Sequence, residues 1–332
     1  MIQGGPADKA FSIRFGRGPM ARAAFTLFIL ISLTICPGGF ALASGQGPEG
    51  RISIALLISK EILPYLKAAD GFEEEVRRSN PAIFVRRYSL EEQELSPERL
   101  SRILDSSGYR AAAAVGPEAA RLLWAANGVR SVKRFYCMVL DPERVVERGA
   151  CGVPLNIAAF RQLQAVCRLF PEIRRIGILY DPDLNAGFVL EASAAAADMD
   201  ITIVPLEVRD RGLIKQVLGD RWASFDALWL IPDRTVISET LVRYIIKEAL
   251  RNGRPVIGYN RFFHSSGALM SFILDYGRIG RQAARLCLDV LSGKGCRRVE
   301  PAFSIWINRR AGQILGIALP RADESGMEVV IK

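Results

Sequence analysis

The chain has a single histidine among its 332 residues, His264. A Ser-His-Asp triad would have to use it, but its neighbours Phe263 and Ser265 form no nucleophile elbow and the pattern G-x-S-x-G is absent. A zinc site needs more than one histidine or a close cysteine pair, and the chain offers neither. We therefore expect no catalytic residues and no metal, and we expect His264 to be packed or to lie on the surface.

Glycine loops that bind phosphate are also missing. No predicted strand is followed by G-x-G-x-x-G, which argues against a Rossmann dinucleotide site. The segment Ser292-Gly-Lys-Gly295 lacks the spacing of a P-loop. The sequence thus predicts a protein that is not an enzyme and has no cofactor.

Long apolar runs are confined to the N-terminal region. Three arginines (Arg14, Arg17 and Arg22) precede an apolar stretch at 23–35, and Ala41-Leu-Ala43 follows as a small-x-small cleavage site. This order is typical of a secretory signal peptide, and the apolar stretch is too short for a membrane span. We predict a signal peptide over 1–43, cleaved after Ala43, a linker over 44–50, and a periplasmic protein.

A lipoprotein anchor at Cys36 is the second interpretation of this region. Leu33-Thr-Ile-Cys36 is similar to a lipoprotein cleavage box. Ile35 is large for the position before the cysteine, and Pro37 is unfavourable after it, so we rank lipidation below simple export.

The formal charge is +9, but lysine and arginine are scattered and form no basic tail. We expect a solvated basic surface and no nucleic-acid partner. Half of the residues are apolar, as in a globular protein, and the length suggests two domains or two lobes around a cleft.

Five cysteines remain after residue 43: Cys137, Cys151, Cys167, Cys287 and Cys296. Their number is odd and their spacing matches no metal motif. An oxidising compartment permits a disulfide, and either Cys137 with Cys151 or Cys287 with Cys296 can pair. Cys167 and Cys287 fall inside helical patterns, which predicts buried thiols.

Short apolar segments alternate with amphipathic ones along the whole chain. The predicted strands are 51–58, 81–88, 110–115, 135–140, 151–154, 175–180, 201–205, 227–231, 255–259, 268–274 and 302–307. The predicted helices are 64–78, 97–105, 117–126, 158–170, 187–199, 213–218, 239–251, 279–291 and 309–315. This alternation, repeated twice, predicts an α/β fold with two doubly wound parallel-sheet lobes.

Acidic residues recur where strands end, at Asp141, Asp181, Asp233 and Asp275. In the stretch 226–239, proline ends an apolar run just before Asp233, and a serine and a glutamate then mark a helix start. Ligands bind outside the carboxyl ends of strands in open parallel sheets. Each aspartate can be a turn residue, but together they favour a site for a polar ligand.

At these motifs the chain resembles the substrate-binding proteins of ABC transporters, of the tryptophan- and tyrosine-binding type, which have the type I periplasmic binding protein fold. The motifs, in chain order, are Gly116-Pro-Glu-Ala-Ala120, Asp141-Pro142, Arg175-Ile-Gly-Ile-Leu-Tyr-Asp-Pro182, Pro232-Asp-Arg-Thr-Val236, Pro255-Val-Ile-Gly258, Gly267-Ala-Leu269, Asp275-Tyr276, Ile279-Gly-Arg-Gln-Ala283 and Asn308. They span nearly all of the chain after the signal peptide.

The resemblance implies two lobes joined by a hinge of about three crossings, with the ligand held by closure. The N-terminal lobe would be 51–156 plus 276–296, and the C-terminal lobe 157–275 plus 297–332. It implies that Asp233 meets a ligand amine. The other implied ligand-binding residues are Ser59, Lys60, Glu61, Gly116, Pro117, Asp181, Asn260 and Asp275. Arg261 can pair a ligand carboxylate or lie on the surface.

The chain departs from the family pattern in the first, third and ninth strand-end loops, at 60–64, 115–117 and 259–262, so the ligand itself is not predicted beyond an amino-acid-like compound. We expect an exported, monomeric solute-binding protein that delivers a small polar or amphipathic ligand to an ABC permease. An exported module that signals to a membrane receptor or kinase has the same fold and stays open as an alternative. A regulator's effector domain would need an N-terminal helix-turn-helix, and an apolar signal stands there instead.

Overall fold

A computed structural model describes residues 52–127, 131–219, 221–320 and 327–332. The predicted signal peptide and linker lie outside these residues. All described residues fall within one compact unit, 47–332. They form two sheets, which we call sheet A and sheet B.

Sheet A has five parallel strands in the order β2-β1-β3-β4-β5. The strands are β1 (Ser53–Ile58), β2 (Phe84–Ser89), β3 (Tyr109–Val115), β4 (Lys133–Val139) and β5 (Cys151–Pro154). Its helices are α1 (Leu63–Ser79), α2 (Pro97–Ser106), α3 (Pro117–Ala125) and α9 (Tyr276–Leu291), with a short 3-10 turn η1 (Pro142–Arg144) after β4. Two separate apolar clusters, one with α1 and α9 and one with α2 and α3, cover its two faces.

Sheet B has seven strands in the order β12-β11-β10-β9-β8-β6-β7. The strands are β6 (Arg175–Tyr180), β7 (Thr202–Glu207), β8 (Ala227–Leu230), β9 (Val256–Gly258), β10 (Met270–Leu274), β11 (Phe303–Ile307) and β12 (Val329–Ile331). The helices are α4 (Ala159–Leu169), α5 (Pro182–Ala197), α6 (Ile214–Gly219), α7 (Glu239–Arg251), α8 (Arg261–Ser265) and α10 (Arg309–Leu315), with 3-10 turns η2 (Arg211–Leu213) and η3 (Trp222–Ser224). Apolar clusters again lie on both faces, which confirms the doubly wound prediction.

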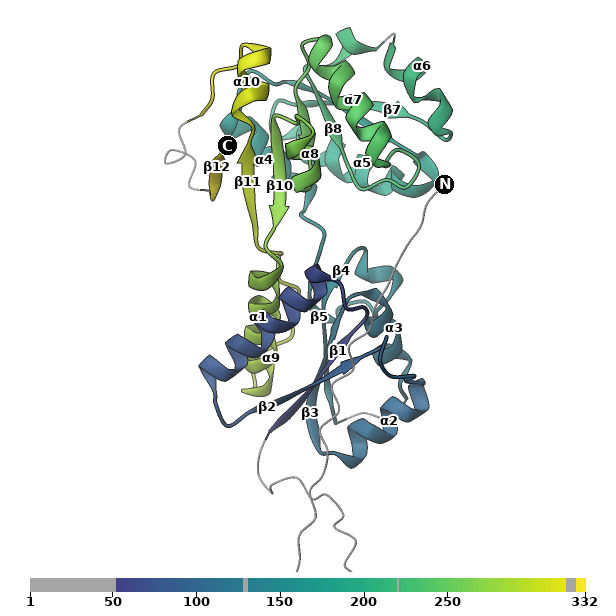
Figure 1. Cartoon of the computed structure of the whole chain (residues 1–332), viewed down its shortest axis with the longest axis vertical. Helices are drawn as coiled ribbons and strands as arrows, with labels where there is room; N and C mark the ends of the chain where they lie inside the picture. Colours follow the sequence, from purple (N-terminus) through teal and green to yellow (C-terminus); the bar gives the residue numbers. More distant parts are fainter. Residues whose placement is uncertain (1–51, 128–130, 220, 321–326) are drawn as a thin grey trace, which may run out of the picture. The chain divides into compact units, whose positions relative to one another are not determined.

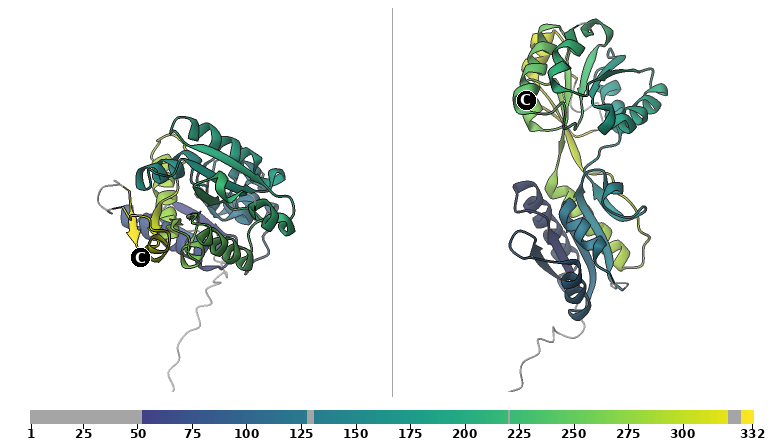
Figure 2. Two further views of the ribbon diagram at one scale, coloured as in Figure 1. Left: turned by 90° about the horizontal axis from the view of Figure 1, so that it is seen from above. Right: turned by 90° about the vertical axis from the view of Figure 1, so that its right-hand side faces the viewer.

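Two edge strands break the parallel arrangement of sheet B, because β11 runs antiparallel to β10 and β12 runs parallel to β11. The chain leaves sheet B at the carboxyl end of β10, forms α9 against sheet A, and re-enters sheet B from the same edge. It therefore connects the two sheets three times: after β5, after β10 and after α9 (Figures 1 and 2). This is the number of crossings that the family resemblance implied.

Element boundaries differ from the prediction mainly at helix starts. Helix α5 begins at Pro182 rather than 187, because Asp181 caps it, and Asn185 interrupts it with non-helical angles (φ −129°, ψ 15°). Helix α9 begins at Tyr276, because Asp275 caps it. The short elements α8 and β12 were not predicted, since neither is long enough to show a period.

Helices α1 and α9 lie side by side against sheet A, drawn in purple and yellow-green in Figure 1. Glycines make this approach possible. A methyl group on Gly280 would lie 1.9 Å from the carbonyl oxygen of Ala68, and one on Gly71 would lie 2.2 Å from that of Gly277. Close packing against α1 fixes the position of the start of α9, where Tyr276 is the first residue.

A buried carboxylate, Glu75 (1% exposed), joins α1 to α9. It accepts hydrogen bonds from Arg285 Nε at 2.9 Å and from Arg78 Nη2 at 2.6 Å. The hydrogen bond from Arg285 is the main reason that the pKa of Glu75 is lowered from 4.5 to about 2.

We expect Glu75 to make the folded state sensitive to acid. A folded-state pKa below the unfolded one stabilises the protein above about pH 4.5, and this stabilisation is lost as the pH falls toward about 2. Replacing Glu75 by Gln should flatten that part of the pH profile. Urea unfolding between pH 5 and 2.5 measures the slope, and an unchanged slope in the variant would contradict the assignment.

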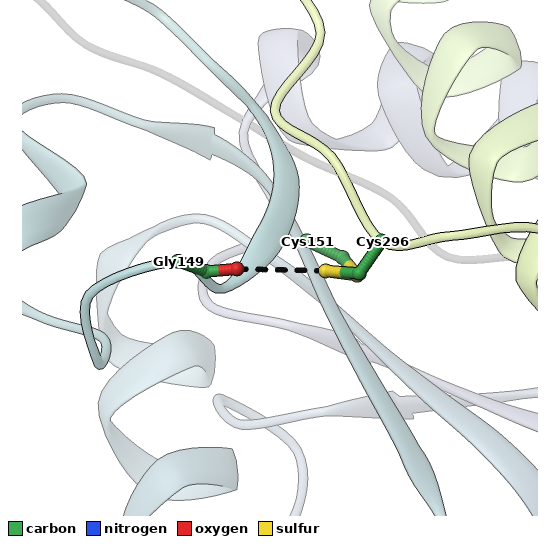
Figure 3. Close-up of a disulfide and its surroundings, with 3 residues drawn as sticks. All are labelled: Gly149, Cys151 and Cys296. Atoms are coloured by element: carbon green, nitrogen blue, oxygen red, sulfur yellow. Dashed lines mark hydrogen bonds between the residues drawn. A yellow bond between two sulfur atoms is a disulfide. The ribbon is translucent and has the colours of Figure 1, made fainter.

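A disulfide joins Cys151, at the start of β5, to Cys296, which follows α9 (Figure 3). Both predicted pairings, Cys137 with Cys151 and Cys287 with Cys296, are therefore wrong. They relied on nearness in sequence, whereas the return of the chain beside β5 brings together residues 145 positions apart.

The other three cysteines of the described residues, Cys137, Cys167 and Cys287, are free. Cys137 and Cys287 are buried, and burial raises the pKa of Cys137 to about 12 and also raises the pKa of Cys287. This confirms the prediction for Cys287, while Cys167 is only half-buried. Within the described part of the chain, no helix is long and apolar enough to cross a membrane.

Candidate functional site

A cavity of about 270 Å³ lies beyond the carboxyl ends of strands from both sheets. Its apolar wall consists of Leu140, Leu155, Ile157, Phe188, Trp229, Leu230, Ile231, Pro232, Tyr259, Leu274 and Tyr276. Its polar wall consists of Asp141, Asn156, Gln162, Asn185 and Asn260. A mostly apolar cavity with a few polar groups is the usual form of a small-molecule site.

Four aromatic side chains line this cavity. Phe188 and Trp229 meet edge to face with ring centroids 5.3 Å apart. Burial, with the charge of Asp233, raises the pKa of Tyr259 to about 12. Burial also raises the pKa of Tyr276, against a lowering influence of the Arg261 charge. Both phenols are therefore protonated hydrogen-bond donors at neutral pH.

Among the described residues that line the wall, Asp141 is the only charged one. Its backbone is left-handed (φ 48°). Three residues earlier, Met138 also has a positive φ (61°), and at that residue the pairing of β4 with β5 shifts register. Such a bulge re-aims the residues that follow it. Asn156 holds the carboxylate by donating Nδ2 to Oδ1 at 2.8 Å.

Asp233 is buried (4% exposed), and four donors bind its carboxylate. Oδ1 accepts from the backbone nitrogens of Thr235 at 2.9 Å and Val236 at 3.1 Å. Oδ2 accepts from the backbone nitrogen of Asp181 and from Nδ2 of Asn185, both at 2.8 Å. Four donors match the acceptor capacity of a carboxylate, so in this conformation Asp233 organises its loop and holds Asn185 in the cavity wall.

Three other predicted residues, Asp181, Asn260 and Asp275, cap helices. Asp181 Oδ1 accepts from the backbone of Asp183 at 3.0 Å, and Asn260 Oδ1 from Phe263 at 3.2 Å. Asp275 Oδ1 accepts from the backbone of Arg278 at 2.9 Å. A strand that leads directly into a helix needs a cap at that point, which explains why polar residues recur there.

The predicted residues of sheet A gather around the ends of β1 and β3, outside the cavity wall. Ser59 Oγ accepts from the backbone of Ala119 at 2.8 Å, so Ser59 caps α3 from a neighbouring strand. Gly116 (φ 93°) leaves room for that hydroxyl, since a methyl there would lie 2.6 Å from Ser59 Oγ. Pro117 is the first residue of α3.

The remaining predicted residues are charged and exposed. Lys60 Nζ lies 3.9 Å from Glu118 Oε1, and the backbone nitrogen of Glu61 donates to Glu91 Oε2 at 2.8 Å. The guanidinium of Arg261 lies 4.9 Å from the ring centre of Trp306.

The cavity thus includes one of the ten predicted ligand-binding residues, Asn260. Asp141 was recognised as a strand-end acid but not selected, and Asn156, Gln162, Asn185 and the aromatic residues were missed. Two sequence features could have indicated this cavity. They are Asp141-Pro142 at the end of a predicted strand, and Asn185, which follows Asp181-Pro182. Gln162 and Phe188 lie on helices, where nothing local distinguishes a cavity residue from a core residue.

A larger hollow of about 740 Å³ lies beside the disulfide. It is lined by the starts of β4 and β5, the end of α9 and several basic side chains, among them Lys133, Arg148 and Lys294. It is open and lies at the amino ends of the strands. The smaller cavity is the better candidate for a ligand site, because parallel sheets bind ligands at their carboxyl ends. The single histidine, His264, is buried and packs against Trp306, in agreement with the prediction that it is packed or lies on the surface.

Comparison with known proteins gives matches of three kinds. A family model for the ABC transporter substrate binding protein matches residues 150–322, just over half of the chain. The "Tyrosine-binding protein" of Clostridioides difficile (strain R20291) is 25% identical over 181 residues, which is 51% of each protein. The chain therefore spans about half the length of that relative.

Two solved structures share the fold. A ligand-free, open substrate binding protein with adhesive properties from Clostridium difficile superposes with a TM-score of 0.70 at 15% identity, covering 85% of this chain and 99% of that one. The ABC domain in complex with L-Trp from Streptococcus pneumonia gives a TM-score of 0.55 at 19% identity, covering 84% and 100%. The fold is that of the type I periplasmic binding proteins, as predicted, and the chain belongs to the ABC transporter substrate binding protein family.

Proposed function

We propose that this chain is an exported solute-binding protein that captures an amino-acid-like ligand with an aromatic side chain and delivers it to an ABC permease. The observation that carries the proposal is the cavity, whose wall combines four aromatic side chains with a single carboxylate. An aromatic amino acid has the matching parts, an apolar ring and an ammonium group. The tyrosine-binding relative and the solved complex with L-Trp support the same ligand class.

Asp141 is the proposed partner of the ligand ammonium. Among the described residues, only Asn156 binds its side chain, through Oδ1. Its Oδ2 is therefore available to accept a charge-assisted hydrogen bond.

Asn260 and Arg261 are the proposed partners of the ligand carboxylate. Asn260 uses Oδ1 as a helix cap, and its Nδ2 has no acceptor among the described residues. The guanidinium of Arg261 lies on the ring of Trp306, and its charge acts on Tyr276 in the cavity wall, so the proposal has its side chain rotate toward the ligand carboxylate. The predicted residues around Ser59 and Gly116 would meet the ligand only after the two lobes close.

Export is supported by the disulfide between Cys151 and Cys296, since disulfides persist in oxidising compartments. We keep the predicted signal peptide, the lobe boundaries and a monomeric state as parts of this proposal. Closure of the lobes around the ligand would then favour the form that the permease recognises.

The proposal is tested by titrating the mature chain, residues 44–332, calorimetrically with L-tyrosine, L-tryptophan, L-alanine and L-lysine. We expect binding of the two aromatic amino acids and none of the others. Preferential binding of L-alanine or L-lysine would contradict it. Uptake of the ligand that depends on this protein would favour transport, and a signalling response without uptake would favour the sensory alternative.

Replacing Asp233 by Asn should weaken binding indirectly. The amide would face the donors from Asp181 and Asn185 with a nitrogen, which costs about 2 kcal/mol of unfolding free energy and disorders the cavity wall. L-tyrosine and its amine-free analogue 3-(4-hydroxyphenyl)propionate should therefore lose affinity by the same factor. A loss confined to L-tyrosine would instead show that Asp233 itself binds the amine.

A further inference from the structure

Gln162 is a buried polar residue (8% exposed) on α4, and its side chain forms part of the cavity wall. Its Nε2 donates to the carbonyl oxygen of Ile157 at 2.9 Å. An amide that gives its nitrogen to a carbonyl turns its oxygen the other way. The orientation of the side chain is therefore fixed by the connection between β5 and α4.

The oxygen of this amide, Oε1, has no donor among the described residues. Some side-chain atoms, such as Tyr136 Oη, are fully enclosed and have no hydrogen-bond partner. Oε1 is not among them, so part of its surface remains accessible. Since Gln162 is almost wholly buried and borders the cavity, the surface that Oε1 keeps lies toward the cavity. Water can pair with Oε1 while the cavity holds no ligand. A ligand that displaces this water without supplying a donor leaves the acceptor unpaired, and a ligand donor that reaches Oε1 avoids that cost.

We infer that Gln162 Oε1 selects ligands whose ring carries a hydrogen-bond donor, such as a phenol O–H or an indole N–H. The inference rests on the proposed function, because it takes the ligand to be an aromatic amino acid. Other residues of the wall (Ile157, Phe188, Trp229) are apolar and offer no hydrogen bond that would distinguish one ring from another. A bare ring would leave Oε1 unpaired and desolvated, so a site of this kind rejects it. We expect a preference of about 10- to 100-fold for L-tyrosine over L-phenylalanine.

Gln162 also holds the carbonyl of Ile157, and a purely structural role must be distinguished from selection. A structural role would change the affinity for both amino acids by the same factor. Selection would change the affinity for L-tyrosine alone. The ratio of the two affinities therefore separates the roles.

The test compares L-tyrosine and L-phenylalanine by calorimetry in the wild-type chain and in Gln162→Met. Methionine has nearly the same length and is only a weak acceptor. We expect the variant to bind L-phenylalanine within about twofold of wild type and to lose the preference for L-tyrosine. The matched control is Gln164→Met on the same helix, whose side chain bonds Arg161 outside the cavity and which should leave both affinities unchanged.

A second arm uses the wild-type chain alone and replaces L-tryptophan by 1-methyl-L-tryptophan, which lacks the indole N–H. We expect a similar loss of affinity. Equal affinities for L-tyrosine and L-phenylalanine in the wild type, or an equal loss of both in Gln162→Met, would overturn the inference while leaving the proposed function intact. Failure of every aromatic amino acid to bind would overturn both.

Discussion

Replacing Asp141 by Asn should weaken the binding of L-tyrosine by about 100-fold, which corresponds to about 2.7 kcal/mol. The substitution removes only the charge. Asparagine tolerates the left-handed backbone of position 141, and its remaining oxygen can still accept from Asn156. A charge-assisted hydrogen bond to an ammonium group is about twice as strong as a neutral one, so most of the loss should come from this bond.

The chain offers a closely matched control for this substitution. Asp200 also has a left-handed backbone (φ 53°), but its side chain is exposed and pairs with Arg174 away from the cavity. Asp200→Asn should leave the affinity unchanged. For 3-(4-hydroxyphenyl)propionate, which has no amine, Asp141→Asn should not weaken binding. A loss of affinity for that compound as large as for L-tyrosine would refute the role of Asp141.

Removal of the disulfide should lower the free energy of unfolding by about 5 kcal/mol. The bridge closes a loop of 145 residues, which greatly restricts the unfolded chain. The variant Cys151→Ser with Cys296→Ser should show this loss in urea unfolding, and dithiothreitol should reproduce it in the wild type. Dithiothreitol should have no effect on the double variant, which keeps the three free cysteines.

The disulfide should affect stability more than ligand affinity. It lies at the amino ends of the strands of sheet A, on the opposite edge from the cavity, and Cys296 Sγ contacts the carbonyl of Gly149 (Figure 3). We therefore expect the double variant to bind L-tyrosine with nearly wild-type affinity at a temperature where it is folded. An unchanged unfolding free energy in the double variant would contradict the structural role.

The architecture could be predicted from the sequence because it depends on local patterns. Pro232 ends a strand, and Ser238 caps the next helix by accepting from the backbone of Leu241, as predicted. Such signals repeat through both sheets, so the order of strands and helices follows from them. The reversal of β11 was not predicted, because it depends on where the chain returns after α9.

The site was predicted less well, and Asp233 shows why. Strand-end acids serve two purposes that look alike in a sequence: they cap helices and they bind ligands. Asp181 and Asp275 cap helices, Asp233 organises a loop, and Asp141 lines the cavity. Only the backbone geometry around Asp141 distinguishes it, and a sequence does not display that geometry.

The disulfide and Gln162 depend on tertiary structure in the same way. Cys151 meets Cys296 because α9 crosses from one sheet to the other before the chain returns. Gln162 lies on a helix whose buried face mostly contributes to the core, and only the neighbouring loops turn its position into a cavity wall.

The central claim is that an aromatic amino acid occupies the cavity with its ammonium on Asp141. The most direct measurement is a crystal structure of the mature chain with L-tyrosine. We predict the ligand nitrogen within about 3 Å of a carboxylate oxygen of Asp141 and the ring against Phe188 and Trp229. A ligand bound beside the disulfide, or one whose nitrogen lies on Asp233 instead, would contradict the account.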